Sequence, residues 1–396
     1  MDTSSPAADG APFQTGQTAP PGAFGSAAGP VPEMDVPAAA GTLPRRTLPL
    51  PPVDRLPHAG AALVAREQAL VARGTRAALA LRRAPPPLAT RWWRILHPGR
   101  FWVSLVALAL GTAVAWSEPS KTGSTFHLAR LLEMILVVLL LHAGANALNE
   151  YYDARRGVDG EDAPGSSGIL QKGLLQPETV RKVGLTLLLA GAACLLVETL
   201  TTHTWGVLLL GGAAVLLSYF YSATPYALGY LPLGELTVGF VMGPAVLMSS
   251  VEIEGAQVNA FVIAFSLALG SLAAAATLAN NLRDLETDRA ANKRTLVTYL
   301  GVQMGRTFYL VLVLLPYLLI ALVAFPSGRP HGILLVLLTL PGLVVVITGI
   351  LRAEAPAATN LVVAQTLRLH RSFSLWLLAG YLLSLVVAAL LSILGL

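Results

Sequence analysis

Nine apolar runs, each about as long as a bilayer is thick, constrain this 396-residue chain more than any other feature. A membrane helix needs roughly 17 to 25 mostly apolar residues to cross the hydrocarbon core, and it is helical because its backbone polar groups find no water there. The predicted spans cover residues 101–117, 128–150, 183–200, 204–221, 232–251, 258–282, 307–325, 332–351 and 373–394. The sequence therefore predicts an all-α, polytopic membrane protein with nine transmembrane helices.

The composition supports this class and excludes two others. Hydrophobic residues make up 54% of the chain and charged residues 12%, which is too apolar for an ordinary soluble protein. The formal net charge of +5 does not indicate nucleic-acid binding, because the basic residues are spread over loops beside apolar runs. We therefore expect the lipid bilayer, and no nucleic acid, among the partners.

The basic residues also predict the orientation in the membrane. If the first span leaves the cytoplasm, alternate loops are basic, whereas the opposite loops hold little beyond Lys121 and Arg329. The basic set comprises Arg91, Arg94, Arg100, Arg155, Arg156, Lys172, Arg181, Lys182, Arg289, Lys293, Arg294, Arg306, Arg352, Arg368 and Arg371. Basic loops stay in the cytoplasm. We expect a multi-pass protein of a cell inner membrane, with a cytoplasmic amino terminus and the carboxyl terminus outside.

Residues 1–90 differ from the rest of the chain, being rich in Pro, Ala, Gly and Ser without a sustained apolar run. Such a segment cannot bury enough surface to offset its ordering entropy, so we expect a disordered amino-terminal extension. Two alternatives stay open for residues 61–83 within it: a basic helix that lies on anionic lipid, or a solvated tail. Residues 91–396 then form the transmembrane domain.

Two polar segments interrupt the apolar chain, and each follows directly from a predicted span. The first begins at Asn149 and continues past Asp153 to Asp159, and the second runs from Asn280 to Asp288. Both contain Asn-x-x-x-Asp followed by a further Asp, and both are predicted on the cytoplasmic face. Acidic residues in loops are usually only solvated, but two clusters with shared spacing at one membrane face indicate a function.

The second segment has the spacing of a helix face. Asn280, Asp284 and Asp288 are four residues apart, so a helical extension of the sixth span presents two carboxylates side by side. Hard oxygen ligands on two helices can hold Mg²⁺ through one or two carboxylates each, with water and diphosphate oxygens completing the coordination. The pattern therefore predicts Mg²⁺ bound together with an anionic substrate.

The first segment has a different geometry. Asp153 and Asp159 are six residues apart and cannot share a helix face, whereas Gly157 between them is a natural helix stop. A polar stripe leads to this point from His142 through Asn146 in steps of three and four residues. For His142 we favour a hydrogen bond between helices over a catalytic role.

Further residues extend the two motifs. The first reads Asn149-Glu150-Tyr151-Tyr152-Asp153 with Arg156-Gly157-Val158-Asp159, and the second reads Asn280-Asn281-Leu282-Arg283-Asp284-Leu285-Glu286-Thr287-Asp288 with Lys293-Arg294-Thr295-Leu296. Together with Gly234-Glu235-Leu236, they resemble the UbiA superfamily of intramembrane aromatic prenyltransferases. The likeness covers about residues 95–395 and is greatest to the branch that prenylates 1,4-dihydroxy-2-naphthoate in menaquinone biosynthesis.

The resemblance implies a fold, a cofactor and a set of site residues. It implies nine helices around a central cavity, with diphosphate and Mg²⁺ at the cytoplasmic mouth and the prenyl chain in a lipid-facing cleft. The implied catalytic residues are Asp153, Asp159, Asp284, Asp288, Lys172 and Tyr221, and the four aspartates are the expected metal ligands. The implied substrate-binding residues are Asn146, Asn149, Arg156, Glu235, Asn280, Asn281, Arg283 and Lys293. For Glu235, helix capping is the alternative.

The implied reaction transfers a polyprenyl chain from polyprenyl diphosphate to 1,4-dihydroxy-2-naphthoate, with loss of the ring carboxylate and release of diphosphate. Ser222-Ala223-Thr224-Pro225 follows Tyr221 in place of a basic pair found in ubiquinone-pathway relatives, which counts against 4-hydroxybenzoate as acceptor. Two alternatives stay open. One is the same chemistry with another acceptor, such as homogentisate, a chlorophyllide or a lipid glycerol phosphate. The other is a membrane carrier, although carriers gather acidic groups and broken helices at the midplane.

Overall fold

The computed structural model of this chain describes residues 70, 85–117, 127–158, 160, 165–325 and 331–394. The helices given below belong to one unit, Arg83–Leu396. The expected amino-terminal extension lies almost wholly outside the described residues, so its disorder and the boundary at residue 90 stay predictions. Helix α2 starts at Leu88, before that boundary.

Every regular element among the described residues is helical, which confirms the all-α class. The α-helices are α2 (Leu88–Leu96), α3 (Trp102–Ser117), α4 (Leu128–Arg156), α5 (Pro177–Thr202), α6 (Trp205–Phe220), α7 (Gly234–Phe240), α8 (Val246–Ile253), α9 (Ala260–Arg283), α10 (Leu285–Ala290), α11 (Leu296–Ala324), α12 (Leu340–Arg352) and α13 (Pro356–Leu394). Four short 3₁₀ or π segments extend or join them: η2 (Pro98–Arg100), η3 (Leu228–Tyr230), η4 (Val241–Ala245) and η5 (His331–Thr339).

The structure supports a multi-pass membrane protein but does not confirm the number of nine spans. Across the described ranges, seven helical stretches are long and apolar enough to cross a membrane. The count is eight if α2 with η2 and α3, which are bent by 45°, form one span. The predicted run 204–221 folds as α6, an apolar helix of only 16 residues. At 1.5 Å per residue α6 is roughly 24 Å long, which is shorter than the roughly 30 Å hydrocarbon core.

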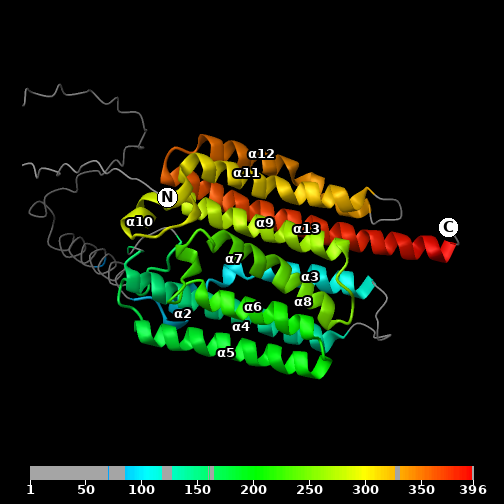
Figure 1. The fold of residues 1–396 in the computed structure, drawn as a ribbon, viewed down its shortest axis with the longest axis horizontal. Helices are drawn as coiled ribbons and strands as arrows, with labels where there is room; N and C mark the ends of the chain where they lie inside the picture. The colour runs from blue at the N-terminus through cyan, green and yellow to red at the C-terminus, as the bar shows by residue number, and fades with distance from the viewer. Residues whose placement is uncertain are drawn as a thin grey trace, which may run out of the picture. The chain divides into compact units, whose positions relative to one another are not determined.

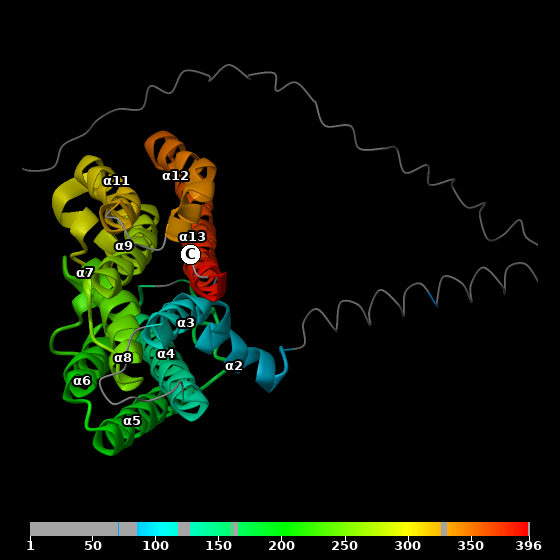
Figure 2. The same ribbon diagram turned by 90° about the vertical axis from the view of Figure 1, so that its right-hand side faces the viewer.

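The helices run side by side along one axis, with α10 at one end of the bundle and the carboxyl terminus at the other (Figure 1). Helix α9 is the most buried span and packs against α7, α11 and α13 (Figure 2). Its sequence explains this place, because Ala, Gly and Ser recur along it and allow neighbouring helices to approach closely. The second polar motif therefore comes from the best-packed helix of the molecule.

Two glycines set the distance between α9 and the segment that starts with α7. A Cβ atom at Gly243 would lie 2.2 Å from the Ser266 carbonyl oxygen, and one at Gly270 would lie 2.4 Å from the Gly239 carbonyl oxygen. The π-helical η4, which contains Pro244, joins α7 to α8 at this crossing. The close packing fixes the start of α7 beside the end of α9, where the second motif lies.

Candidate active site

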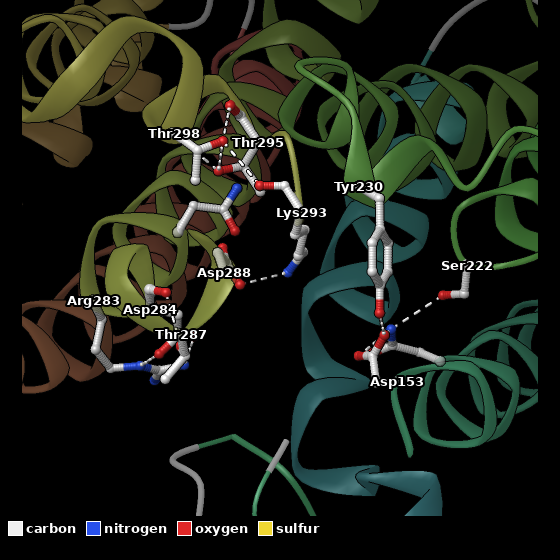
Figure 3. A network of polar contacts seen from close by, with 12 residues as sticks. Asp153, Ser222, Tyr230, Arg283, Asp284, Thr287, Asp288, Lys293, Thr295 and Thr298 are labelled. Atoms are coloured by element: carbon white, nitrogen blue, oxygen red, sulfur yellow. Dashed lines mark hydrogen bonds and ion pairs between the residues drawn. The ribbon is translucent and has the colours of Figure 1, made fainter. Parts of the chain in front are cut away.

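The first motif is organised around Asp153, in the last turn of α4. The Tyr230 hydroxyl donates to Asp153 Oδ1 at 2.6 Å, and Asn149 Nδ2 donates to Oδ2 at 2.9 Å (Figure 3). The Asn149 amide also donates to Ser222 Oγ at 3.1 Å. The four-residue spacing places Asn149 and Asp153 on one helix face. The loop after α6 supplies the other partners.

Helix α4 ends at Gly157, as the sequence predicts. Gly157 has a left-handed φ of 66°, and the Val158 N–H donates to the Asp153 carbonyl oxygen at 3.1 Å. This is a Schellman ending, in which glycine allows the chain to leave the helix direction. Asp159 lies outside the described residues, so its role as a metal ligand stays a prediction.

In the second motif, Asp284 is held by the preceding residue. Arg283 Nε and Nη2 donate to the two Asp284 carboxylate oxygens at 2.7 and 2.6 Å, a bidentate pair. Arg283 Nη1 donates to Asn360 Oδ1 at 2.9 Å, which links the end of α9 to α13. The Asp284 side chain is 29% exposed and the Arg283 side chain is 6% exposed. Arg283 is therefore bound by protein groups, and its predicted contact with phosphate needs an exchange of partners.

Among the described carboxylates of the two motifs, Asp288 is the most deeply buried. Its side chain is 1% exposed, and Lys293 Nζ lies 3.3 Å from Oδ1. Its Oδ2 is buried without a hydrogen-bond partner in the part of the chain that the structure describes. Burial raises the pKa of Asp288 to about 6 against the attraction of Lys293. Burial alone lowers the pKa of Lys293, but the nearby Asp288 and Asp153 outweigh it, so the pKa of Lys293 is raised.

The predicted helical step through the second motif is kept, although the helix breaks. Asp284 has φ −94° and ψ 10°, which ends α9 and begins α10. Its N–H still donates to the Asn280 carbonyl oxygen at 2.9 Å, and the Asp288 N–H donates to the Asp284 carbonyl oxygen at 2.7 Å. Asn280 is half-buried in the final turn of α9. The three motif residues therefore follow one another at single-turn spacing.

Tyr230 is a site residue that the sequence analysis missed. Besides its bond to Asp153, its ring lies 4.3 Å from the Arg156 guanidinium carbon and 5.3 Å from Lys293 Nζ. Its carbonyl oxygen accepts the Arg294 N–H at 3.0 Å. Burial, and then the negative charge of Asp153, raise the pKa of Tyr230, so the phenol stays a hydrogen-bond donor. Tyr230 thus joins the two motifs, and its place in a short loop after α6 carries no signal in the sequence.

Tyr221 and Glu235 lie next to this cluster. Burial raises the pKa of Tyr221 to about 12; the charges of Lys293 and Arg100 oppose this, and those of Asp153 and Glu235 add to it. Tyr221 is therefore within electrostatic range of both motifs. Glu235 lies in the first turn of α7, and its Oε1 accepts a hydrogen bond from Asn281 Nδ2 of α9 at 2.8 Å.

Three other residues singled out in the sequence have different surroundings. Asn146 Nδ2 donates to the Leu96 carbonyl oxygen at 2.8 Å, which ties α4 to the end of α2. Lys172 is exposed on the turn before α5. The His142 Nδ1 is 2.9 Å from Ser104 Oγ of α3, which confirms the favoured hydrogen bond between helices. The catalytic role of Lys172 and the substrate-binding role of Asn146 stay predictions.

The oxygen donors fit a magnesium ion that is shared with a substrate. Across the described residues, no three His, Cys, Asp or Glu side chains converge closely enough to hold a metal ion by themselves. Mg²⁺ is usually bound through one or two carboxylates together with water and substrate phosphates. The unpartnered Oδ2 of Asp288 supplies an oxygen of that kind.

Curated relatives share most of the chain. The chain is 27% identical over 293 residues to 1,4-dihydroxy-2-naphthoate octaprenyltransferase of Bacillus subtilis, covering 74% of this chain and 92% of that protein. It is 30% identical over 282 residues to the Escherichia coli protein of the same name, covering 70% and 90%. It is 29% identical over 250 residues to UbiA prenyltransferase domain-containing protein 1 of Xenopus tropicalis, covering 62% and 69%.

Solved structures share the fold. A UbiA homolog from Archaeoglobus fulgidus bound to DMAPP and Mg²⁺ matches with a TM-score of 0.55 and 18% identity, over 74% of this chain and 99% of that one. A digeranylgeranylglyceryl phosphate synthase matches with a TM-score of 0.52 and 16% identity, over 74% and 98%. The model of the UbiA prenyltransferase family matches residues 101–365. Since the match takes in both motifs and most of the described helices, this chain belongs to the UbiA prenyltransferase family.

Proposed function

We propose that this protein transfers a polyprenyl chain from polyprenyl diphosphate to 1,4-dihydroxy-2-naphthoate. The ring carboxylate is lost as CO₂, diphosphate is released, and the product becomes demethylmenaquinone on oxidation. The observation that carries the proposal is the junction of the two Asn/Asp motifs through Tyr230, with Arg156 and Lys293 beside it. The names of the bacterial relatives support the naphthoate acceptor.

The aspartates are proposed as the metal-binding side of the site. Asp153, Asp284 and Asp288, together with Asp159, would hold Mg²⁺ through their carboxylate oxygens, and Asn149 and Asn280 would support the same complex through their amides. When bound, Mg²⁺ neutralises negative charge on the leaving diphosphate and acts as a Lewis acid. The Archaeoglobus homolog, whose structure holds both DMAPP and Mg²⁺, supports this choice of cofactor.

The cations are proposed as the phosphate-binding side. Lys293 and Arg156 approach the same Tyr230 ring, and Arg283 holds Asp284. As diphosphate arrives, these side chains exchange carboxylate, ring and carbonyl partners for phosphate oxygens, and the released carboxylates become available as ligands. Lys172, on its exposed turn, adds a further positive charge that steers both anionic substrates toward the site.

Heterolysis of the carbon–oxygen bond then gives an allylic cation, which the naphthoate ring attacks. The protein shields this cation from water by burying the polar groups around it. Asp288 and Glu235 are 1% and 4% exposed, and Tyr221 lies in electrostatic range of Glu235 and Asp153. We place Tyr221 beside the reacting carbon, where its neutral phenol stabilises positive charge without reacting.

A second candidate keeps this chemistry with another acceptor. The Xenopus relative and the digeranylgeranylglyceryl phosphate synthase, which share the family or the fold, are not named as naphthoate prenyltransferases. The same fold therefore accommodates more than one acceptor. The carrier alternative gains no support from the family assignment. The proposed location is the inner membrane, with the amino terminus and the site at the cytoplasmic face, and the basic loops support it.

Prenyl transfer by the purified protein tests the proposal. Protein in liposomes receives labelled polyprenyl diphosphate, Mg²⁺ and either 1,4-dihydroxy-2-naphthoate or a panel of phenolic and lipid acceptors. We expect prenylated naphthoquinone that disappears with EDTA and in Asp153→Ala and Asp284→Ala, while Asp54→Ala in the predicted amino-terminal extension keeps activity. Product with a different acceptor alone would change the substrate but keep the chemistry. No product with any acceptor, from protein that binds polyprenyl diphosphate, would refute the proposal.

A further inference from the structure

One buried carboxylate of the site has no part in the diphosphate chemistry. The Glu235 side chain is 4% exposed, and Asn281 Nδ2 donates to its Oε1 at 2.8 Å. Its Oε2 is buried and meets no hydrogen-bond partner within the described ranges. A buried polar atom without a partner costs free energy, so proteins seldom keep one unless a ligand or water completes it.

Glu235 lies close to the reacting groups. Asn281, its partner, follows motif residue Asn280 directly on α9. The Glu235 carboxylate is among the charges that act on Tyr221, together with Asp153 and Lys293. Gly239 of α7 and Gly243 of η4 pack directly on the α9 backbone around Gly270, which sets the distance of Glu235 from α9. Oε2 is therefore a fixed oxygen beside the site.

Glu235 differs from the motif aspartates in what it contacts. Asp284 is paired with Arg283, and Asp288 is paired with Lys293. Glu235 contacts a neutral amide instead, and no ion pair joins it to any residue that the structure describes. Such surroundings do not suit a phosphate, which would be repelled. They suit a ligand that brings its own proton, such as a phenolic hydroxyl.

We propose that Glu235 Oε2 accepts the proton of an acceptor hydroxyl, and that Asn281 is the residue that positions this carboxylate. The inference rests on the proposed function and specifies how its acceptor is activated. A hydroxyl releases electron density to the ring carbons ortho and para to it. In 1,4-dihydroxy-2-naphthoate, only the 1-hydroxyl is ortho to the carbon that bears the carboxylate. This ortho relation assigns the 1-hydroxyl to Glu235.

The step balances without an oxidant or reductant. Glu235 Oε2 takes the hydroxyl proton, and the O–H electron pair moves toward the ring. The carbon that bears the carboxylate forms a bond to the allylic carbon, and diphosphate departs with the electron pair of the broken carbon–oxygen bond. CO₂ then leaves, its bonding pair returns to the ring, and the ring oxygen recovers the proton from Glu235. The carboxylate ends in its starting state.

The test compares acceptors that differ in one hydroxyl. The full-length protein receives saturating polyprenyl diphosphate and Mg²⁺ with 1,4-dihydroxy-2-naphthoate, its 1-methyl ether or its 4-methyl ether. For the wild type, we expect the 1-methyl ether to lower kcat/KM for the acceptor roughly a hundredfold, since proton transfer contributes factors of about 10² to 10⁴. The 4-methyl ether is expected to have the smaller effect.

Glu235→Gln and Glu198→Gln form a matched pair. Glu198 is 5% exposed and also has a buried carboxylate oxygen without a described partner. Glu178, at the other end of α5, accepts a hydrogen bond from Tyr151 of the first motif. At 1.5 Å per helical residue, Glu198 lies about 30 Å along α5 from Glu178. We expect Glu235→Gln to lower kcat/KM for 1,4-dihydroxy-2-naphthoate roughly a hundredfold. Its kcat/KM values for this acceptor and for the 1-methyl ether should then agree within about threefold. Glu198→Gln is expected to behave as the wild type does.

Binding of polyprenyl diphosphate in the presence of Mg²⁺ shows that a variant is folded. If Glu235→Gln fails this check, Asn281→Ser replaces it, since that variant keeps the carboxylate and removes its positioning amide. Asn281→Ser is expected to weaken the discrimination between the native acceptor and the 1-methyl ether, which a merely structural role would leave unchanged.

Three results would overturn the assignment of Glu235 and leave the proposed function intact. They are wild-type activity in Glu235→Gln, an equal loss on the native acceptor and the 1-methyl ether, and discrimination that follows the 4-hydroxyl. If the wild type prenylates a different phenol, that phenol and its methyl ether are compared in the same way. A wild type that prenylates no phenolic acceptor refutes the proposed function and this inference together.

Discussion

At the scale of single residues, the charges of the site are satisfied by one another. Arg283 holds Asp284, Lys293 pairs with Asp288, and the Tyr230 hydroxyl donates to Asp153. Buried charges are stable in a protein only when they are paired or hydrogen-bonded. On the proposed function, the carboxylates would bind Mg²⁺ and the cations would bind phosphate oxygens, so each charged side chain that leaves its present partner would gain another of opposite charge.

Tyr230→Phe tests the junction between the motifs. The variant removes the 2.6 Å hydrogen bond to Asp153 and keeps the ring that lies near Arg156 and Lys293. A hydrogen bond to a charged group contributes about 1.5 to 3 kcal/mol, so we expect kcat/KM to fall roughly tenfold or more. Tyr226→Phe is the control, because Tyr226 is 59% exposed. Equal activity of the two variants would contradict the role of Tyr230.

The pKa of Asp288 predicts how Mg²⁺ binding depends on pH. Burial raises this pKa to about 6, so the carboxyl group is protonated in metal-free protein at pH 5 and ionised at pH 7. Metal ligands bind deprotonated, so the affinity for Mg²⁺ should rise with pH through this range. At pH 5, one unit below the pKa, we expect the affinity to be about tenfold lower than at pH 7. Mg²⁺ titrations with bound polyprenyl diphosphate at both pH values measure it.

Asp288→Asn separates this effect from the titration of diphosphate itself. The variant binds Mg²⁺ more weakly at pH 7, and its affinity should change less between pH 5 and pH 7 than that of the wild type. The same pH dependence in both proteins would show that Asp288 does not contribute to the metal site.

At the scale of elements, the site is formed where regular helices are interrupted. Helix α9 breaks at Asp284, and the segment from α7 to α8 passes through a π-helical stretch with Pro244. π-Helical insertions are often found at functional sites. Both interruptions lie on elements that pack closely together, so the irregular backbone is supported by α9, the most buried span among the described helices.

Gly243→Ala tests that support. Its Cβ atom would lie 2.2 Å from the Ser266 carbonyl oxygen, which is backbone and cannot turn aside. Overpacking of this kind costs about 1 to 3 kcal/mol, so we expect a lower thermal midpoint and a loss of prenyl transfer. Gly212→Ala on α6 is the control, because nothing lies within 4 Å of the added atom. A Gly243→Ala protein as stable and active as Gly212→Ala would refute this account.

Apolar runs predicted where helices lie, but not where they begin. Helix α13 starts at Pro356, whereas the apolar run begins at residue 373, because Gln365, Arg368 and Arg371 lower the hydropathy of its first half. Helix α11 similarly starts at Leu296, and Gly301, with φ 81°, kinks it before the apolar run at residue 307. Hydropathy measures burial in lipid, and these first turns are helical without being apolar.

The candidate site was predictable only in part for a related reason. Spacing along one helix predicted that Asn149 and Asp153 share a face, and the structure joins them at 2.9 Å. Spacing says nothing about partners from other elements. The Tyr230 hydroxyl on Asp153 and the Asn281 amide on Glu235 cross 77 and 46 residues of sequence. Such contacts depend on how helices pack, which no local pattern determines.

At the scale of the whole molecule, two segments separated by 131 positions reach one neighbourhood. Asn149 and Asp153 precede Asn280 and Asp284 by that number, and the end of α4 and Lys293, which follows α10, meet around Tyr230 (Figure 3). The same end of the bundle holds α10 and the turn with Lys172. A site at one end, and not at the midplane, suits a reaction between a lipid-borne donor and a water-borne acceptor.

This arrangement makes the proposed orientation testable with single cysteines. Cys194 is the one cysteine of the chain, so Cys194→Ala provides a clean background. Thr287, exposed on α10, marks the end with the site, and Trp205, 61% exposed at the start of α6, marks the other. In intact cells whose outer membrane admits a charged maleimide, we expect labelling of Trp205→Cys and none of Thr287→Cys, because the basic loops near Thr287 stay in the cytoplasm.

Permeabilising the inner membrane should make Thr287→Cys reactive. The reverse pattern would place the site outside, where neither diphosphate nor its cytoplasmic acceptor is supplied, and would contradict the proposed topology while leaving the chemistry of the site unchanged.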